Sequence, residues 1–151
     1  MKLNDYKEIL DFAINREIEA QDFYKAVAEK MKDKNIIDMF LGFVKEEENH
    51  EKMLRHILDS ERIGKYFDEK QDYKISETFE SPKVSDGMTP ANAFALAAKN
   101  EEAAMNLYTD LAKVCTDPEQ RQVFEDLAAM ERGHKKKMED SFVQIGYPEV
   151  W

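Results

Sequence analysis

The stretch FLGFVKEEENH, residues 40–50, sets a glutamate and a histidine into an otherwise apolar helical stripe. Steps of three and four residues keep side chains on one helix face, and here they connect Phe40, Phe43, Glu47, His50, Leu54 and Ile57. Glu47 and His50 are three residues apart, so a helix points both in nearly the same direction. Because a buried ionisable group needs a partner, the stripe indicates a helical bundle with a polar site in its core.

The same pattern occurs a second time, 84 residues further along and without a gap. Residues 9–58 repeat as residues 93–142. The corresponding polar positions are Glu17 and Glu101, Tyr24 and Tyr108, Glu47 and Glu131, and His50 and His134. Each half thus has a Glu-x-x-His pair and one more glutamate on the preceding helix. The repeat predicts that four glutamates and two histidines converge in one site.

Apolar periodicity close to that of an α-helix runs through four long segments, which predicts an all-α protein. The first two cover about residues 5–32 and 36–64. The third and fourth begin at Thr89-Pro90 and Asp117-Pro118, each a cap residue followed by proline at the first helical position. The fourth ends near residue 146. Short turns within each pair predict two antiparallel hairpins.

Residues 65–88 join the two hairpins and are rich in Asp, Glu, Lys and Ser. A helix of about 26 residues is about 39 Å long, whereas about 23 extended residues reach about 75 Å. The linker is therefore long enough to cross the whole bundle. Two antiparallel hairpins joined by a long crossover form the ferritin-like four-helix bundle, which we predict as a single domain over residues 1–151.

The composition excludes several classes of partner and site. Charged residues make up 36% of the 151 residues, and the net charge of −10 argues against binding to nucleic acid or to an anionic membrane surface. The single cysteine, Cys115, excludes an internal disulfide and a multi-cysteine metal site, and its stripe position predicts an inert core side chain. No apolar run has the length of a signal peptide or a membrane span, so we expect a cytoplasmic protein.

The converging glutamates indicate a site for two metal ions. Four carboxylates in one bundle centre bring a charge of about −4, which two divalent cations would balance. His50 and His134 would add one neutral nitrogen ligand to each ion. Such oxygen-rich coordination favours iron or manganese and tolerates zinc, but it does not suit copper(I). The alternative is a set of solvated helix faces, or a protonated network without metal.

The remaining polar residues near the stripes have weaker assignments. Tyr24 and Tyr108 fit ordinary aromatic packing and equally fit hydroxyl groups that hold a metal-bound glutamate in place. His56 lies about 120° round the helix from His50, which predicts a surface position. Glu51 is an outer acid near the seam, and its counterpart in the repeat is Lys135, which argues against a shared ligand role.

At these residues the sequence resembles the rubrerythrins within the ferritin-like diiron family, over about residues 5–145. Residues 15–24 and 100–108 resemble the motifs of the first and third helices of that family, and residues 47–50 and 131–134 those of the second and fourth. The resemblance implies that Glu47 and Glu131 bridge the two metals. It implies terminal ligand roles for Glu17, His50, Glu101 and His134.

Two features depart from the rubrerythrin pattern. Ala104 stands where the third helix usually carries an extra carboxylate, and the sequence has no four-cysteine rubredoxin segment. The resemblance nevertheless implies a diiron oxidoreductase that reduces hydrogen peroxide or dioxygen with electrons from an external donor protein such as a rubredoxin. The departures leave two alternatives open, a ferroxidase that handles iron and a non-catalytic bundle stabilised by metal. The family also implies a homodimer.

Overall fold

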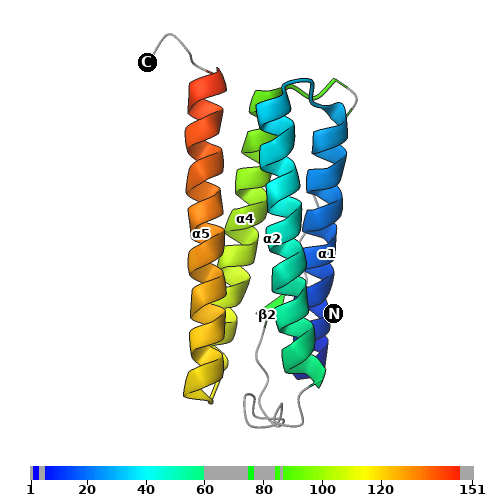
Figure 1. The fold of residues 1–151 in the computed structure, drawn as a ribbon. Coiled ribbons are helices and arrows are strands. Elements are labelled where there is room, and N and C mark those ends of the chain that lie inside the picture. Colours follow the sequence, from blue (N-terminus) through cyan, green and yellow to red (C-terminus); the bar gives the residue numbers. More distant parts are fainter. Residues whose placement is uncertain (1, 4–5, 60–74, 77–83, 86, 147–151) are drawn as a thin grey trace.

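The computed structural model describes residues 2–3, 6–59, 75–76, 84–85 and 87–146. Its four long helices are α1 (Tyr6–Lys30), α2 (Lys34–Asp59), α4 (Pro90–Val114) and α5 (Pro118–Gly146). Helices α1 and α2 pack as one antiparallel hairpin, and α4 and α5 pack as the other (Figure 1). The prediction of an all-α bundle of two hairpins is therefore confirmed.

The order of the helices is that of a crossover bundle. Helix α2 ends at the lower end of the molecule in Figure 1, whereas α4 begins at the upper end, so the two helices run in the same direction. Most of the predicted linker, residues 65–88, lies outside the described residues, as does the predicted end of the second helix beyond Asp59.

Two short strands accompany the helices. β1 (Lys2–Leu3) pairs antiparallel with β2 (Ile75–Ser76), and Lys2 lies opposite Ser76. These strands were not predicted, because two residues are too few to produce a detectable alternation of apolar and polar side chains.

The ends of the helices are capped where the sequence places cap residues. Thr89 accepts a hydrogen bond from the backbone N–H of Asn92 through its hydroxyl oxygen, at 3.1 Å. Asp117 does the same for Gln120 at 2.9 Å. These bonds satisfy backbone donors that have no partner within the helix. α4 and α5 accordingly begin at the prolines that follow these cap residues, Pro90 and Pro118.

Two apolar clusters form the core, one toward each end of the bundle. The lower cluster includes Leu10, Leu54, Leu111 and Phe124. The upper cluster includes Tyr24, Phe40, Phe94 and Met138. Both clusters draw on all four helices, and the predicted polar residues occupy the layer between them. The polar layer is thus enclosed by apolar side chains above and below.

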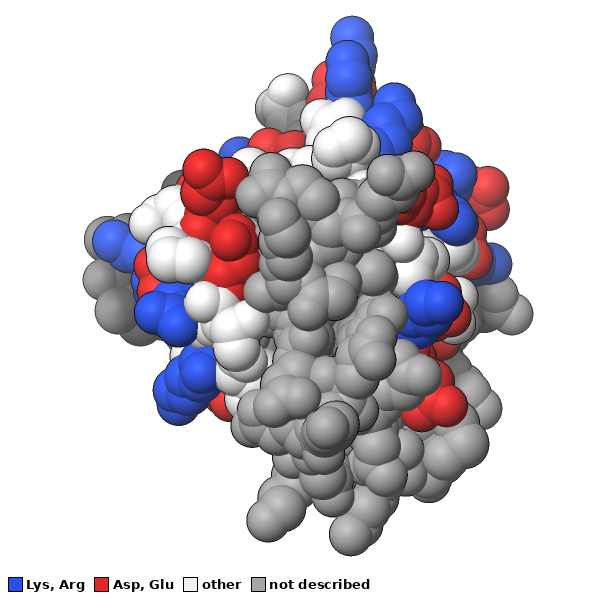
Figure 2. All heavy atoms as spheres, turned by 90° about the horizontal axis from the view of Figure 1, so that it is seen from below, with Lys and Arg blue, Asp and Glu red and all other residues white. Residues whose placement is uncertain are grey.

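Charged side chains of both signs are visible when the molecule is seen from below. In Figure 2, acidic and basic side chains lie intermixed among the described residues at the rim of this face. Among the described helices, none combines the length and the apolar composition that crossing a membrane requires.

Candidate metal centre

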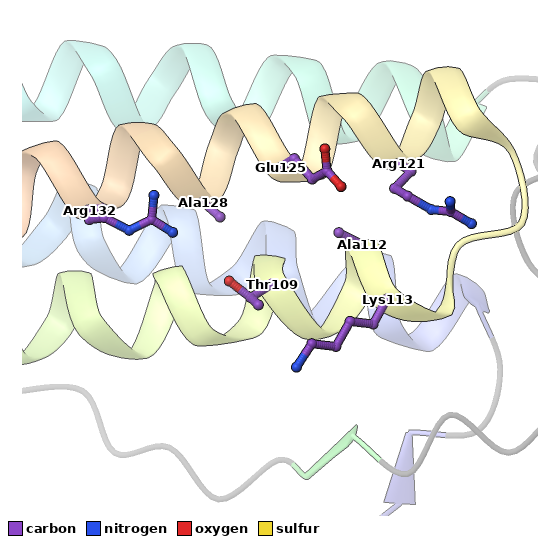
Figure 3. A pocket seen from close by; sticks show the side chains of 7 residues that line it. All are labelled: Thr109, Ala112, Lys113, Arg121, Glu125, Ala128 and Arg132. Carbon is purple, nitrogen blue, oxygen red and sulfur yellow. The ribbon is translucent and has the colours of Figure 1, made fainter.

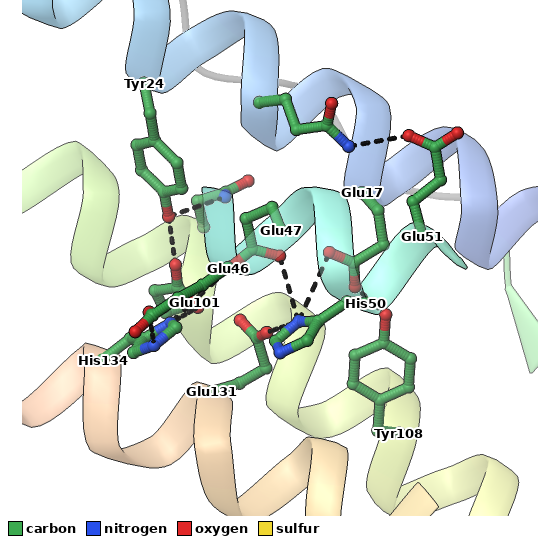
Figure 4. A network of polar contacts seen from close by, with 12 residues as sticks. Glu17, Tyr24, Glu46, Glu47, His50, Glu51, Glu101, Tyr108, Glu131 and His134 are labelled. Carbon is green, nitrogen blue, oxygen red and sulfur yellow. Dashed lines mark hydrogen bonds and ion pairs between the residues drawn. The ribbon is translucent and has the colours of Figure 1, made fainter. Parts of the chain in front are cut away.

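The structure brings the six predicted ligands together in the middle of the bundle (Figure 4). Helix α1 supplies Glu17 and α4 supplies Glu101, while α2 and α5 each supply one Glu-x-x-His pair. The side chains form two groups of four, Glu17, Glu47, His50 and Glu131 in one and Glu47, Glu101, Glu131 and His134 in the other. Within each group the ligand atoms lie within 4.8 Å of one another.

Glu47 and Glu131 belong to both groups. Each group therefore offers three carboxylates and one imidazole, and two of the carboxylates are shared. This arrangement corresponds to the bridging roles that the resemblance implies, although the ligand roles themselves stay a prediction.

The two histidines present their Nδ1 atoms to the glutamates. His50 Nδ1 lies 2.7 Å from Glu131 and 3.3 Å from Glu47. His134 Nδ1 lies 3.6 Å from both Glu47 and Glu101. The imidazole rings are almost parallel, with their centroids 6.3 Å apart. The two halves of the site therefore repeat one another in space as they do in sequence.

Several buried polar atoms of this layer make no hydrogen bond of acceptable geometry among the described residues, although His50 Nδ1 and Glu131 Oε1 lie within ion-pair distance of each other. They are Oε2 of Glu17 and Glu101, Oε1 of Glu47 and Glu131, Nδ1 of His134 and both ring nitrogens of His50. A buried polar atom without a partner costs about 1–3 kcal/mol. Nearly all of these atoms belong to the two groups of four, so divalent cations fit the site as the missing partners.

Without a cation, protons balance the negative charge of the clustered glutamates. Burial and repulsion by Glu47 raise the pKa of Glu17 well above its usual range and that of Glu101 to about 7. Burial lowers the pKa of His50 and His134, but contacts with the glutamates outweigh it and raise both to about 10. Burial also raises the pKa of Glu47, but hydrogen bonds from its neighbours outweigh it and lower that pKa overall. Metal ions must therefore compete with protons for this site.

Each of the two tyrosines donates a hydrogen bond to a glutamate of the other hairpin. Tyr24 on α1 donates to Glu101 on α4, and Tyr108 on α4 donates to Glu17 on α1 (Figure 4). Asn100 in turn donates to the Tyr24 hydroxyl oxygen at 3.3 Å. Both rings are fully buried, so each tyrosine packs in the core and positions a candidate ligand at the same time.

Replacing each tyrosine with phenylalanine tests this positioning role. Tyr24→Phe and Tyr108→Phe keep the rings but remove the hydrogen bond to Glu101 or Glu17. We expect each variant to bind metal about 10–100-fold more weakly, as is usual when a group that orients a ligand is lost. Competition with a chelator of known affinity measures the change. The control is Thr109→Val, which removes the neighbouring hydroxyl that bonds to Met105 instead; equal affinities in all of these proteins would refute the role.

The other acids and histidines named from the sequence lie away from the centre. Glu51 accepts hydrogen bonds from Gln21 at 2.8 Å and from Arg55 at 2.7 Å. His56 is exposed. Glu46, which was not predicted as a site residue, contacts Nε2 of His134. Glu46 lies off the core stripe, so helical periodicity predicts a surface residue there. Periodicity does not reveal that a long side chain can reach a partner on another helix.

A groove on the outer face of α4 and α5 is separate from this centre. It has a volume of about 600 Å³ and is lined by Thr109, Ala112, Lys113, Arg121, Glu125, Ala128 and Arg132 (Figure 3). None of the six predicted ligands lines it. The buried polar layer, rather than this groove, is therefore the candidate site.

Comparison with protein families agrees with this geometry. The family model described as rubrerythrin matches residues 8–141. The chain belongs to the rubrerythrin family. The match covers all of α2 and α4, most of α1 and α5, and all six predicted ligands. A search of curated proteins finds no match.

Two solved structures are similar to this rubrerythrin-family chain over most of their length. One is a candidate ferritin-like diiron-carboxylate protein from Thermotoga maritima, with a TM-score of 0.79, 19% identity, and coverage of 94% of this chain and 96% of that one. The other is a hypothetical protein from Pyrococcus furiosus, with a TM-score of 0.72, 26% identity, and coverage of 93% and 89%. The first similarity confirms the ferritin-like fold.

Proposed function

We propose that the protein is a diiron-carboxylate oxidoreductase that reduces hydrogen peroxide, or alternatively dioxygen, with electrons from an external donor protein such as a rubredoxin. The observation that carries the proposal is the pair of four-residue groups that share Glu47 and Glu131. Three carboxylates and one imidazole per group suit iron, with manganese or zinc as other occupants. When bound, two ferrous ions supply the two electrons that, with two protons, convert one peroxide molecule to two water molecules.

The residues of the centre have definable tasks in this reaction. The carboxylates of Glu47 and Glu131 would hold both cations and balance the charge that increases on oxidation. Tyr24 and Tyr108 keep Glu101 and Glu17 in place through their hydroxyl groups. The apolar clusters above and below exclude water from the layer. Each group of four would hold one cation, and the bound cation would supply a Lewis-acid position for the oxidant.

Stopped-flow mixing tests the peroxide reaction. Protein loaded anaerobically with ferrous iron should give a fast ferric product when mixed with peroxide, with two ferrous ions consumed per peroxide molecule. The controls are free ferrous iron and the variant Glu47→Ala with Glu131→Ala, which lacks both shared carboxylates. An oxidation rate equal to that of free ferrous iron would contradict the proposal.

Ferroxidase activity with iron handling is the second candidate function, because Ala104 occupies the position at which the rubrerythrin pattern carries an extra carboxylate. Ala104 packs against the lower apolar cluster, so this position of α4 contributes a methyl group and no further carboxylate. A protein that stores iron must bind more than about two iron ions per chain within a shell or an assembly with a partner. Light scattering and iron analysis after aerobic loading separate the two functions, and they also test the predicted homodimer.

A non-catalytic bundle stabilised by metal is the third reading. Elemental analysis of the protein purified without added metal, compared with the Glu47→Ala, Glu131→Ala variant, tests whether a metal centre forms at all. Metal in the wild type that is inert to peroxide and to dioxygen would favour this reading over both enzymes.

A further inference from the structure

The repeat matches every predicted ligand with an identical residue, but it does not match the residues next to them. Glu46 precedes Glu47 on α2, and the corresponding residue before Glu131 on α5 is Met130. Both are about half exposed, with 49% of the Glu46 side chain and 47% of the Met130 residue accessible. Their burial is therefore similar, and the difference that matters for the centre is what each side chain can contact.

Glu46 reaches across from α2 to the histidine of α5. One of its carboxylate oxygens pairs with Nε2 of His134, while Nδ1 of the same ring faces Glu47 and Glu101 (Figure 4). The ring thus has one nitrogen directed at the candidate centre and the other held by a carboxylate. A histidine that ligates a metal usually has such a partner, which fixes the orientation and tautomer of the ring and raises its basicity.

His50 lacks a partner of this kind among the described residues. Its Nδ1 faces Glu131, and its Nε2 is buried without a hydrogen bond. The repeat would place Met130 in the role of Glu46, and a thioether is only a weak acceptor. His50 also differs in exposure, with a side chain that is 1% exposed compared with 13% for His134.

We propose that Glu46 makes the two metal positions unequal, so that the position formed by Glu101 and His134 binds the first divalent cation. The inference rests on the proposed two-metal centre and adds an order of loading to it. An outer carboxylate of this type contributes about 10–100-fold in metal affinity. The position formed by Glu17 and His50 then fills second, with an affinity lower by about that factor.

A second contact strengthens the same position. Glu101 accepts a hydrogen bond from Tyr24, and Asn100 donates to the hydroxyl oxygen of that tyrosine. Asn100 is itself fixed by Arg16, which donates to its amide oxygen at 3.3 Å. The Asn100 amide directs the Tyr24 proton toward Glu101. Both ligands that are specific to this position therefore have an anchored outer partner.

Exchanging the two residues tests the proposal. Crystals of the full-length protein grown with one equivalent of Mn²⁺ per chain should show anomalous scattering mainly at the position beside His134. In Glu46→Met the preference should become weaker, with only the contact of Tyr24 and Asn100 left to support it, and in Glu46→Met combined with Met130→Glu the ion should shift toward the position beside His50. A purely structural role for Glu46 would not transfer the ion from one position to the other.

Titration with Mn²⁺ in solution supplies the second readout. Wild-type protein should bind in two steps whose affinities differ by about 10–100-fold, and Glu46→Met should weaken the tighter step. Glu48→Met, on the same helix, is the control and should leave both steps unchanged. Two equal affinities in the wild type, or a preference of unchanged size in Glu46→Met, would overturn the inference while leaving the two-metal centre intact. Absence of Mn²⁺ from both positions would instead refute the centre itself.

Discussion

Replacing Glu47 and Glu131 together should remove both metals from the protein. Each carboxylate belongs to both groups of four, so the double variant takes two of three carboxylates from each position at once. Replacing Glu17 or Glu101 instead takes one carboxylate from a single group. We therefore expect the metal content to fall from about two ions per chain to near zero in the double variant, and to about one ion when either terminal glutamate is replaced by alanine.

The substitution must separate loss of metal from loss of fold. Alanine at two buried positions leaves cavities, whereas Glu47→Gln with Glu131→Gln keeps the shape of both side chains and removes their charge. The matched control is Glu102→Gln with Glu125→Gln, since both residues are exposed and lie on α4 and α5. Elemental analysis after gel filtration gives the metal content, and circular dichroism verifies the helices. Two bound ions in the glutamine variant would show that the shared carboxylates do not hold the metals.

Helical periodicity was sufficient to predict the bundle and to select residues that the structure brings together. The apolar stripe of each helix faces the core. These stripes contain Glu17, Glu47, His50 and their counterparts in the repeat. The 84-residue repeat relates the two hairpins to each other from the sequence alone. The sequence thus predicts on which face of its helix each residue lies.

The partners of these residues could not be predicted in the same way. Tyr24 lies on the same helix as Glu17, yet it bonds to Glu101 on the other hairpin. That pairing depends on how far the hairpins are shifted along the bundle, which periodicity within one helix does not contain. The same holds for Glu46 and His134, which come from helices of different hairpins. Side-chain reach between hairpins is therefore the part that required the structure.

The other large effect concerns stability, because protons and metals compete for the same side chains. The raised pKa values of Glu17 and Glu101 mean that the folded apo protein holds protons that the unfolded chain releases above about pH 4.5. The raised pKa values of His50 and His134, about 10 in each case, have the same effect above about pH 6.5. Each such proton lowers the free energy of unfolding by up to about 1.4 kcal/mol per pH unit within its window.

Glu47 acts in the opposite direction, but only in acid. Its pKa is lowered by folding, so its contribution to stability is present above about pH 4.5 and disappears as the pH falls below that value. The three effects together place the maximum stability of the apo protein near pH 5. From there the melting temperature of the apo protein should fall steadily toward pH 9.

Bound metal should reverse this trend between pH 5 and 8. At a free metal concentration of about 100 times the dissociation constant, each ion adds about 2.7 kcal/mol. For two ions in a chain of this size the melting temperature would rise on the order of 10 °C. Acid protonates the ligands and removes this gain, so the melting curves of apo and metal-loaded protein should converge toward pH 5 and separate as the pH rises.

Thermal melts followed by circular dichroism measure both curves, with Mn²⁺ in air or Fe²⁺ under anaerobic conditions. The Glu47→Gln, Glu131→Gln variant should melt at the same temperature with and without metal at every pH. Proton release provides an independent reading, because Glu17, Glu101 and both histidines must give up protons before they can ligate a cation. At pH 7 the wild type should therefore release more than one proton per ion bound. Melting temperatures at neutral pH that do not change with added metal would mean that no such centre forms.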